Sequence, residues 1–253
     1  EKHLVEALRQ LHGWLKEEEF QQIYECCFGW RLVPKDVKLK EEEKDGSAYP
    51  TVRLSDDAHT VTECELRLIE DLPVEFHVVT QLWIDRVAKY FESCMSSHSY
   101  GYRLRMHKEE INLRYPGSFR LWMKQYQRWH DGALEDIHNA LAKEHKHVVA
   151  LTTDISAFYH NLSPRFLLNA EFRNALGVQS LSRDDETLTK LVVKMLEIWA
   201  KSTPLTRGLP VGCSVSSVIA NLALTLLDRK LETASNIICY GRYVDDIIFA
   251  VEN

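Results

Sequence analysis

Two adjacent acids, Asp245 and Asp246, lie near the centre of the segment IICYGRYVDDIIFAVE, residues 237–252. Apolar, β-prone runs flank them on both sides, and this pattern predicts a β-hairpin with the acids at its tip. Neighbouring carboxylates repel each other and lose hydration beside buried strands, so they need a proton or a cation. A bound divalent metal relieves both effects, and oxygen ligands without nearby His or Cys favour Mg²⁺ or Mn²⁺ over zinc. The alternative is turn chemistry, since short acidic side chains bond their own backbone.

A third acid, Asp154, follows the apolar run 148–153, which predicts a buried strand. If this strand lies beside the hairpin, Asp154 completes a cage of three carboxylates. Such a cage can hold two divalent ions roughly 3.5–4 Å apart and can support phosphoryl transfer. The alternative role for Asp154 is the N-cap of a following helix.

The bulk properties indicate a globular protein of one large or two modest domains, with 253 residues and 45% hydrophobic residues. The sequence has no apolar run of membrane-spanning length, and its charged first twenty residues do not resemble a signal peptide. We therefore expect a cytoplasmic protein with reduced thiols and no membrane partner. The six cysteines have no C-x-x-C spacing, so they signal neither a zinc site nor a disulfide framework.

The net charge of −6 argues against indiscriminate nucleic-acid binding, but residues 103–128 form a basic segment. Seven Lys or Arg, including Arg103 and Arg105, stand there against two Glu, with aromatic residues interleaved. Basic side chains can follow a phosphate backbone while aromatic rings stack on bases. The alternative is an amphipathic segment whose aromatic residues face the core.

The periodicity predicts an α+β fold, because helices and hairpins do not alternate as in a regular βαβ series. Helices are expected over 1–29, 78–95, 119–145, 164–176, 187–201 and 214–231. Extended segments are expected over 49–54, 66–69, 148–153 and 237–252, and loops over 34–60, 96–105 and 203–212.

Three stretches in order, VALTTDISAFYHNL, GLPVGCSVSSVIANLAL and YGRYVDDIIFAV, resemble the palm motifs of reverse transcriptases. The nearest in look are the bacterial types: retron, group II intron and phage-defence enzymes. SHSYGYRLR at 97–105 also resembles a "SYGYRP" stretch that these enzymes carry, and the resemblance covers roughly residues 64–253. It implies the fingers and palm of a right-hand polymerase, the palm being an antiparallel sheet that bears the acids and is packed with helices. Residues 1–147 would form an N-terminal helix and fingers, and residues 148–253 the palm, with fingers elements interleaved around 160–205. Because the family continues into further palm strands and a helical thumb, we expect the thumb to lie outside this chain and the chain to be part of a longer protein.

The resemblance also implies roles for individual residues. Asp154, Asp245 and Asp246 would be catalytic and, with Ile155, would hold two Mg²⁺ ions, for which Mn²⁺ could substitute. Tyr159 would be the steric gate that selects deoxynucleotides, unless it is an ordinary core aromatic. Arg67 would meet the triphosphate, unless it is an exposed arginine without a role. The other residues implied to contact nucleotide are Ser156, Ala157, Phe158, Pro210, Val211 and Gly212, and those implied to contact nucleic acid are Arg103, Arg105 and Tyr243.

The chain departs from the family pattern at Val211, where Gln is usual, and at 213–216, which lack the usual Ser-Pro. Val cannot hydrogen-bond, so contacts to the template or the nucleotide are altered. The expected function is a DNA polymerase that uses dNTPs and an RNA template, with a DNA template as the alternative, in bacterial anti-phage defence or in a retron-like element. Its expected partners are an RNA template or non-coding RNA, the DNA product, dNTPs, and a partner protein or second copy. The alternatives are untemplated or self-primed DNA synthesis, a catalytically idle palm that binds RNA or scaffolds a partner, and an RNA-making palm, which Tyr159 disfavours.

Overall fold

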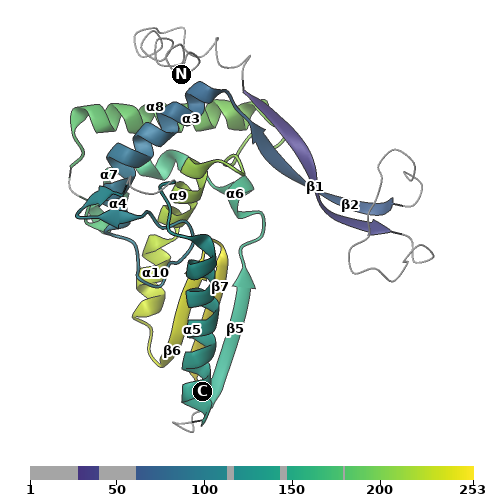
Figure 1. Cartoon of the computed structure of the whole chain (residues 1–253), viewed down its shortest axis with the longest axis vertical. Coiled ribbons are helices and arrows are strands. Elements are labelled where there is room, and N and C mark those ends of the chain that lie inside the picture. The colour runs from purple at the N-terminus through teal and green to yellow at the C-terminus, as the bar shows by residue number, and fades with distance from the viewer. Residues whose placement is uncertain (1–27, 40–60, 113–116, 143–146, 179) are drawn as a thin grey trace.

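The computed structural model describes residues 28–39, 61–112, 117–142, 147–178 and 180–253 (Figure 1). The helix predicted over 1–29 lies almost entirely outside the described residues, as does the extended run at 49–54. Within them, helices and small antiparallel sheets occur together, which is compatible with the α+β prediction. None of the described helices combines the length and the apolar character needed to cross a membrane.

Strands β1 (Gly29–Leu39) and β2 (Val61–Asp71) form a two-stranded antiparallel ribbon that projects away from the helices (Figure 1). The extended segment predicted at 66–69 is confirmed as part of β2. Residues 34–39 belong to a strand rather than to the predicted loop. Both faces of the ribbon meet solvent, so its strands need no continuous apolar pattern; Leu32 and Leu66 are about half exposed.

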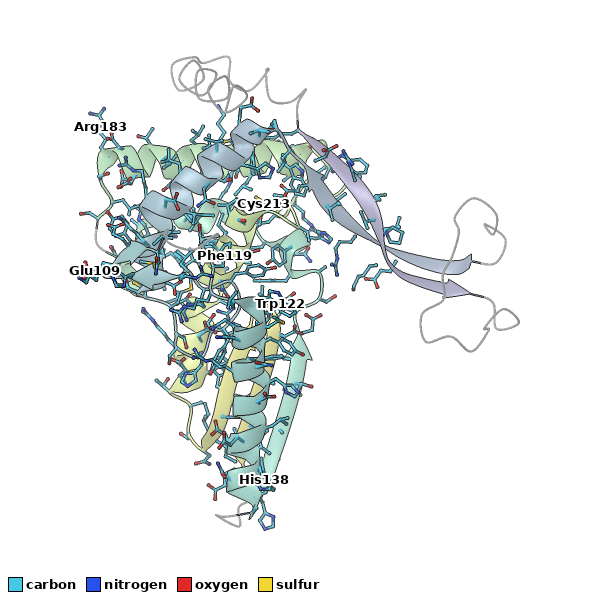
Figure 2. The ribbon with its side chains drawn as sticks, in the orientation of Figure 1. Glu109, Phe119, Trp122, His138, Arg183 and Cys213 are labelled. Atoms are coloured by element: carbon cyan, nitrogen blue, oxygen red, sulfur yellow. The ribbon has the colours of Figure 1, made fainter. Side chains whose placement is uncertain are left out.

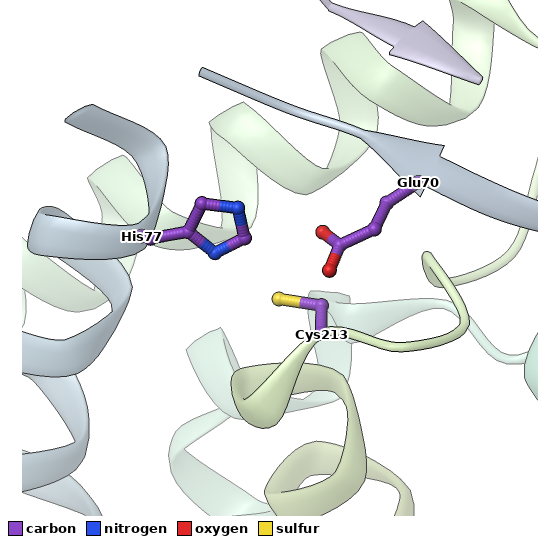
Figure 3. A group of neighbouring side chains, drawn as sticks. All are labelled: Glu70, His77 and Cys213. Atoms are coloured by element: carbon purple, nitrogen blue, oxygen red, sulfur yellow. The ribbon is translucent and has the colours of Figure 1, made fainter. Parts of the chain in front are cut away.

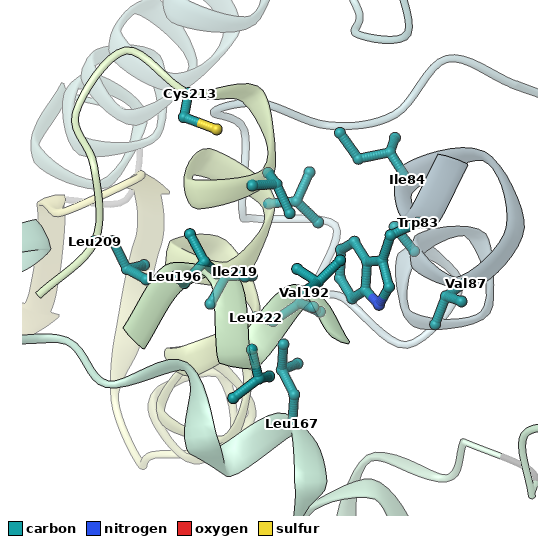
Figure 4. Close-up of a cluster of buried hydrophobic side chains, with 14 of the residues drawn as sticks. Trp83, Ile84, Val87, Leu167, Val192, Leu196, Leu209, Cys213, Ile219 and Leu222 are labelled. Carbon is teal, nitrogen blue, oxygen red and sulfur yellow. The ribbon is translucent and has the colours of Figure 1, made fainter. Parts of the chain in front are cut away.

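A helical core holds the inner end of this ribbon. Helix α3 (Val74–Trp83) continues through the π-helical turn η2 (Ile84–Ala88) into α4 (Lys89–Glu92), so the predicted helix starts earlier than residue 78 and ends before 95. α3 packs against α8 (Arg183–Ser202) and α9 (Ser214–Ala223), with Trp83 among the buried side chains between them (Figure 4). The Trp83 Nε1–H donates to Thr189 Oγ1 at 3.1 Å, which satisfies the polar group that the indole carries into the core.

Capping residues explain where the remaining helices begin. The predicted helix 164–176 is a 3₁₀ turn, η3 (Pro164–Leu168), followed by α7 (Ala170–Leu176), because Asn169 accepts hydrogen bonds from two N–H groups of α7. α8 starts at Arg183 rather than 187 because Ser182 caps it. The predicted helix 214–231 is divided at Leu224 into α9 and α10 (Thr225–Glu232).

A three-stranded antiparallel sheet in the order β5-β7-β6 confirms the predicted strand and hairpin. It contains β5 (Val148–Asp154), β6 (Ile237–Tyr243) and β7 (Asp246–Glu252). Helix α5 (Trp122–Ala142) runs along one face, from Trp122 toward His138 near the far end of the sheet (Figure 2). Its start and end lie inside the predicted helix 119–145.

Strand β5 is not buried as predicted. Its Leu151 side chain is 57% exposed and its Val149 side chain 52% exposed, because β7 is its only strand neighbour in the described part of the chain and α5 packs mainly against β6. An apolar, β-prone run can therefore form an edge strand, and periodicity alone does not separate the two cases. The smaller elements are α6 (Phe158–Asn161) and the two-residue strands β3 (Met106–His107) and β4 (Glu110–Ile111).

Candidate active site

The sheet brings the three predicted acids to one end of the molecule's central strands. Asp154, the last residue of β5, pairs in register with Asp246, the first residue of β7. Residues directly opposite each other in an antiparallel pair carry their side chains on the same face. Asp245 occupies the turn between β6 and β7. The pairing of β5 with β7 thus joins acids that are about ninety residues apart along the chain.

Burial and mutual repulsion set the electrostatics of these acids. Burial raises the pKa of the Asp245 carboxyl, and the neighbouring charges of Asp154 and Asp246 raise it further. Burial and the charge of Asp154 also raise the pKa of Asp246. The three carboxylates do not all approach within 4.8 Å of one another. Positive charge between them would lower the pKa of both groups.

A cleft of about 610 Å³ opens beside the acids. All three line it, as do the predicted nucleotide residue Arg67 and the predicted gate Tyr159. Pro210 is buried and does not line the cleft. The cleft also receives these other predicted residues: Ile155, Ser156, Ala157, Phe158, Val211, Gly212 and Tyr243.

The turn that carries Asp245 has a strained backbone. Val244 has φ +62°, a left-handed conformation in which a β-branched residue is a genuine outlier. Ala157, which also lines the cleft, has a positive φ of 51°. Such strain costs of order 1–3 kcal/mol per residue and persists only where the surroundings enforce it.

A buried arginine, Arg242, enforces the turn. Its Nη1 donates to the carbonyl oxygen of Val244 at 2.7 Å and to Asn221 Oδ1 at 2.9 Å. Its Nε and Nη2 bind the two carboxylate oxygens of Asp228 at 2.7 and 2.6 Å. Tyr240 also donates to Asp228, and the Arg242 and Asp228 side chains are fully buried. This network fastens the acid-bearing turn to α9 and α10.

Sequence reasoning missed Arg242 and Asp228. The available signal was the charge itself, because Arg242 stands inside an apolar strand pattern and a buried charge must be paired.

Gly101, in the stretch SHSYGYRLR, lets the hairpin turn approach closely. A Cβ added at Gly101 would lie 2.6 Å from Val244 Cγ2 and 3.0 Å from the Val244 nitrogen. Asn221 also donates from its side-chain amide to the Gly101 carbonyl. The glycine is therefore needed so that the segment 97–105 can pack directly against the turn.

Tyr159 is held in place by the loop 203–212, which has no regular secondary structure beyond isolated turns, as predicted. The Leu209 N–H donates to the Tyr159 carbonyl at 2.8 Å, and the Tyr159 hydroxyl donates to Ser217 Oγ at 3.4 Å. Burial raises the pKa of this hydroxyl, so the ring stays neutral. Gly208 has φ +95°, and a Cβ there would lie 2.7 Å from the His160 backbone. Only glycine fits this contact.

Two cations from the β1–β2 ribbon line the cleft with the acids. Arg67 is exposed and comes from β2. Lys35 of β1 was not predicted, and its Nζ lies 2.8 Å from Glu65 Oε1 in an exposed ion pair. Guanidinium and ammonium groups in such a cleft suit phosphate oxygens.

The expected nucleic-acid residues lie in different settings. Arg103 is buried, with hydrogen bonds from its guanidinium to Glu92 Oε1 at 2.8 Å and to the carbonyl oxygens of Ser96 and Ser99. A contact of Arg103 with nucleic acid does not fit this burial, because the guanidinium is fully engaged in holding the segment 96–104. Arg105 is half-buried and donates to the Phe119 carbonyl at 2.8 Å.

Tyr243 reaches the cleft and packs edge-on against Tyr126, with ring centroids 5.5 Å apart. Burial raises the pKa of its hydroxyl.

The donor set at the cleft fits hard divalent cations. It consists of three carboxylates whose mutual repulsion a cation would remove. Among the lining residues that the structure describes, His160 is the one imidazole, and there is no sulfur ligand. Acids on neighbouring strands, facing cations across a cleft that can hold a nucleotide, define the class of site that catalyses phosphoryl or nucleotidyl transfer.

The family model described as "Reverse transcriptase (RNA-dependent DNA polymerase)" matches residues 62–253 of this chain. The chain belongs to the reverse transcriptase family. No curated protein sequence matches the chain significantly.

Proposed function

We propose that this chain carries the polymerising site of an RNA-directed DNA polymerase, which joins a dNTP to a 3′-hydroxyl by two-metal phosphoryl transfer. One observation carries the proposal: Asp154 and Asp246 pair in register next to Asp245, and all three line a cleft that also holds Arg67 and Tyr159. Family membership independently supports nucleotidyl transfer.

The chain's own residues would divide the work as follows. Asp154 and Asp245 would be the main ligands of two Mg²⁺ ions, with Asp246 and the Ile155 backbone beside them. When bound, these ions supply an activated 3′-hydroxyl and neutralise charge on the triphosphate. Arg67 and Lys35 would hold the phosphate oxygens from the opposite side of the cleft.

Tyr159 would contact the sugar of the incoming nucleotide. The Leu209 N–H holds its backbone carbonyl and Ser217 accepts from its hydroxyl, so a ribose 2′-hydroxyl would meet a ring that is held in place at both ends. The residues beside it, Ser156, Ala157, Phe158, Val211 and Gly212, would complete the nucleotide pocket, with Pro210 supporting the loop from the interior.

We assign the sheet β5-β7-β6 with α5, α9 and α10 to a palm, within residues 148–253 apart from α5. The β1–β2 ribbon would belong to the fingers, and α6 to α8 would interleave with them, because α8 packs against α3. Arg105 and Tyr243 would face the primer–template duplex.

Primer extension with purified chain, an RNA template, dNTPs and Mg²⁺ tests the proposal. Asp245→Asn should lower the rate of extension by at least about 10²-fold, because interactions with charge that develops in the transition state have about that magnitude. Asp131→Asn, which changes an exposed acid of α5 outside the cleft, is the matched control and should leave the rate unchanged. Equal extension by Asp245→Asn and the parent would exclude the assignment.

The same assay separates templated from untemplated synthesis. Val211 lines the cleft where the family usually has Gln, and its backbone rather than its side chain makes the polar contact, accepting from the Glu70 N–H at 3.4 Å. Products complementary to the RNA support templating. Products that form equally well without it favour a self-primed or untemplated enzyme.

The resemblance of the motifs to bacterial enzymes motivates the further proposal of a role in anti-phage defence. Phage plating on bacteria that express the complete protein tests it, with Asp245→Asn as the inactive comparison. Equal plaque counts for both proteins and for cells without either would contradict this role.

A further inference from the structure

A second group of ligand-type side chains lies on the other side of the loop 208–212 from the acids. Glu70 of β2, His77 of α3 and Cys213, the N-cap of α9, point toward one another (Figure 3). One ligand atom from each lies within 4.8 Å of the other two, and no other set of three in the described residues meets this condition. None of the three lines the cleft of the acids.

One carboxylate oxygen of this group is left unsatisfied by the described part of the chain. Glu70 Oε2 is buried and has no hydrogen-bond partner within the described part of the chain. A buried carboxylate oxygen without a partner has lost its bonds to water and gained none in their place, and native structures contain few such atoms. Burial raises the pKa of Glu70 to about 7 and that of the Cys213 thiol to about 12. A cation would satisfy both groups.

The donors select the kind of cation. A thiolate, an imidazole and a carboxylate are ligands of a borderline-soft metal, whereas Mg²⁺ and Ca²⁺ prefer oxygen alone. Zinc binds sulfur at about 2.3 Å and nitrogen or oxygen at about 2.0–2.2 Å, so its ligand atoms lie about 3.5 Å apart in a tetrahedron. The ligand atoms of the three side chains lie within 4.8 Å of one another, which is somewhat farther apart than in a zinc site. His77 is exposed, so a rotation of its side chain can shorten its distances to the other two ligands.

We propose that Glu70, His77 and Cys213 form a Zn²⁺ site, with water in the fourth position. The ion would displace the thiol proton to solvent and join β2, α3 and α9. These elements surround the loop 208–212, since Ile69 bridges Val211 and the Glu70 N–H donates to the Val211 carbonyl. The zinc site would therefore position Val211 and Gly212, which line the cleft.

Cobalt substitution tests the site directly. The complete chain is stripped with a chelator and titrated with Co²⁺, and a thiolate-to-cobalt charge-transfer absorption in the near ultraviolet reports coordination by sulfur. Cys213→Ser should abolish this absorption. Cys239→Ser, which changes another buried cysteine that packs against α5, should retain it.

A second variant protects the test against misfolding. His77 is exposed, so His77→Gln should preserve the circular-dichroism spectrum and the thermal transition of the metal-free chain. The variant should lower the affinity for Zn²⁺ by at least about tenfold, because one of three protein ligands is lost. Zinc analysis should find about one Zn²⁺ per parent chain and markedly less in Cys213→Ser and in His77→Gln.

Absence of the absorption in the parent, or its persistence in Cys213→Ser, would overturn the proposal, as would unchanged zinc content in His77→Gln. The test is independent of the polymerase assignment. Asp245→Asn should lose DNA synthesis and keep the absorption, because oxygen ligands give no thiolate band.

Discussion

The Asp245 side chain shows how a single residue is prepared for chemistry. The residue before it, Val244, has a left-handed backbone conformation. The pKa of the Asp245 carboxyl is raised because the group is partly buried beside two other acids. Both conditions are unfavourable in the folded chain. A bound cation would relieve the electrostatic one, whereas the backbone strain is held by the surrounding contacts.

At the residue scale, we predict that Tyr159 controls the choice of sugar. Tyr159→Ala should raise ribonucleotide incorporation relative to dNTP incorporation by roughly 10–100-fold, because removing the ring opens space for a 2′-hydroxyl. Tyr159→Phe should keep the parent's selectivity, since the hydroxyl makes only the 3.4 Å bond to Ser217. Competition assays with paired NTP and dNTP measure the ratio. Equal ratios for the Ala and Phe variants would contradict a steric gate.

At the element scale, the hairpin is held from two sides. Arg242 binds the turn and the helices α9 and α10 through Asn221 and Asp228, while Gly101 admits the turn against the segment 97–105. A two-stranded hairpin alone is marginally stable in water. The position of the acids therefore depends on these contacts rather than on the hairpin itself.

Arg242→Met should destabilise the fold by about 3–5 kcal/mol, because it leaves the buried Asp228 carboxylate without its partner. Urea denaturation measures the change. Adding Asp228→Asn to this variant should recover part of the loss, since the remaining buried charge is removed. A double variant as unstable as the sum of both single variants would contradict coupling of the pair.

Gly101→Ala should lower the rate of primer extension by about tenfold or more, because the new Cβ displaces the Val244 turn that carries Asp245. Gly132→Ala is the matched control. A Cβ at Gly132 meets nothing within 4 Å, and the change should stabilise helix α5 by up to about 1 kcal/mol. Normal extension by Gly101→Ala would show that the turn tolerates the displacement.

At the scale of the whole molecule, the cleft is assembled from the β1–β2 ribbon, the loop 208–212 and one end of the sheet. Folding brings Asp154, Asp245 and Asp246 together at this cleft and partly buries Glu70 beside His77 and Cys213. Ionising these carboxyls in the folded chain costs free energy, and this cost depends on pH.

In chelator, this cost should make stability fall as pH rises. The pKa values of Glu70 and Asp245 are raised in the folded state, to about 7 for Glu70, so between the ordinary carboxyl range and these values the folded chain holds protons that the unfolded chain has released. Stability contributed by these groups is then lost on raising the pH through that window. The double variant Glu70→Gln, Asp245→Asn lacks this loss. The thermal midpoint of the double variant minus that of the parent should therefore increase between about pH 5 and pH 7.5. A difference that stays constant over this range would contradict the raised pKa values.

Local sequence patterns were sufficient to predict the strands and the helix around the three acids. The two apolar runs of the hairpin 237–252, the run before Asp154 and the helical spacing in 119–145 each predicted the observed strand or helix, because these signals depend on residues a few positions apart. Helix boundaries were less accurate where side chains such as Ser182 and Asn169 decided the cap. The exposure of β5 was not predictable, since an apolar run does not reveal how many neighbours a strand has.

The sequence by itself predicted that three acids, a Gly/Pro loop and Arg67 belong to one kind of site, because the types of their side chains limit the chemistry they can perform. The tertiary structure alone decided that Arg103 is buried, that Arg242 holds the turn and that Glu70, His77 and Cys213 meet. The physical reason is distance along the chain: Cys213 lies more than a hundred residues from the other two, and no local spacing encodes a contact that only packing creates.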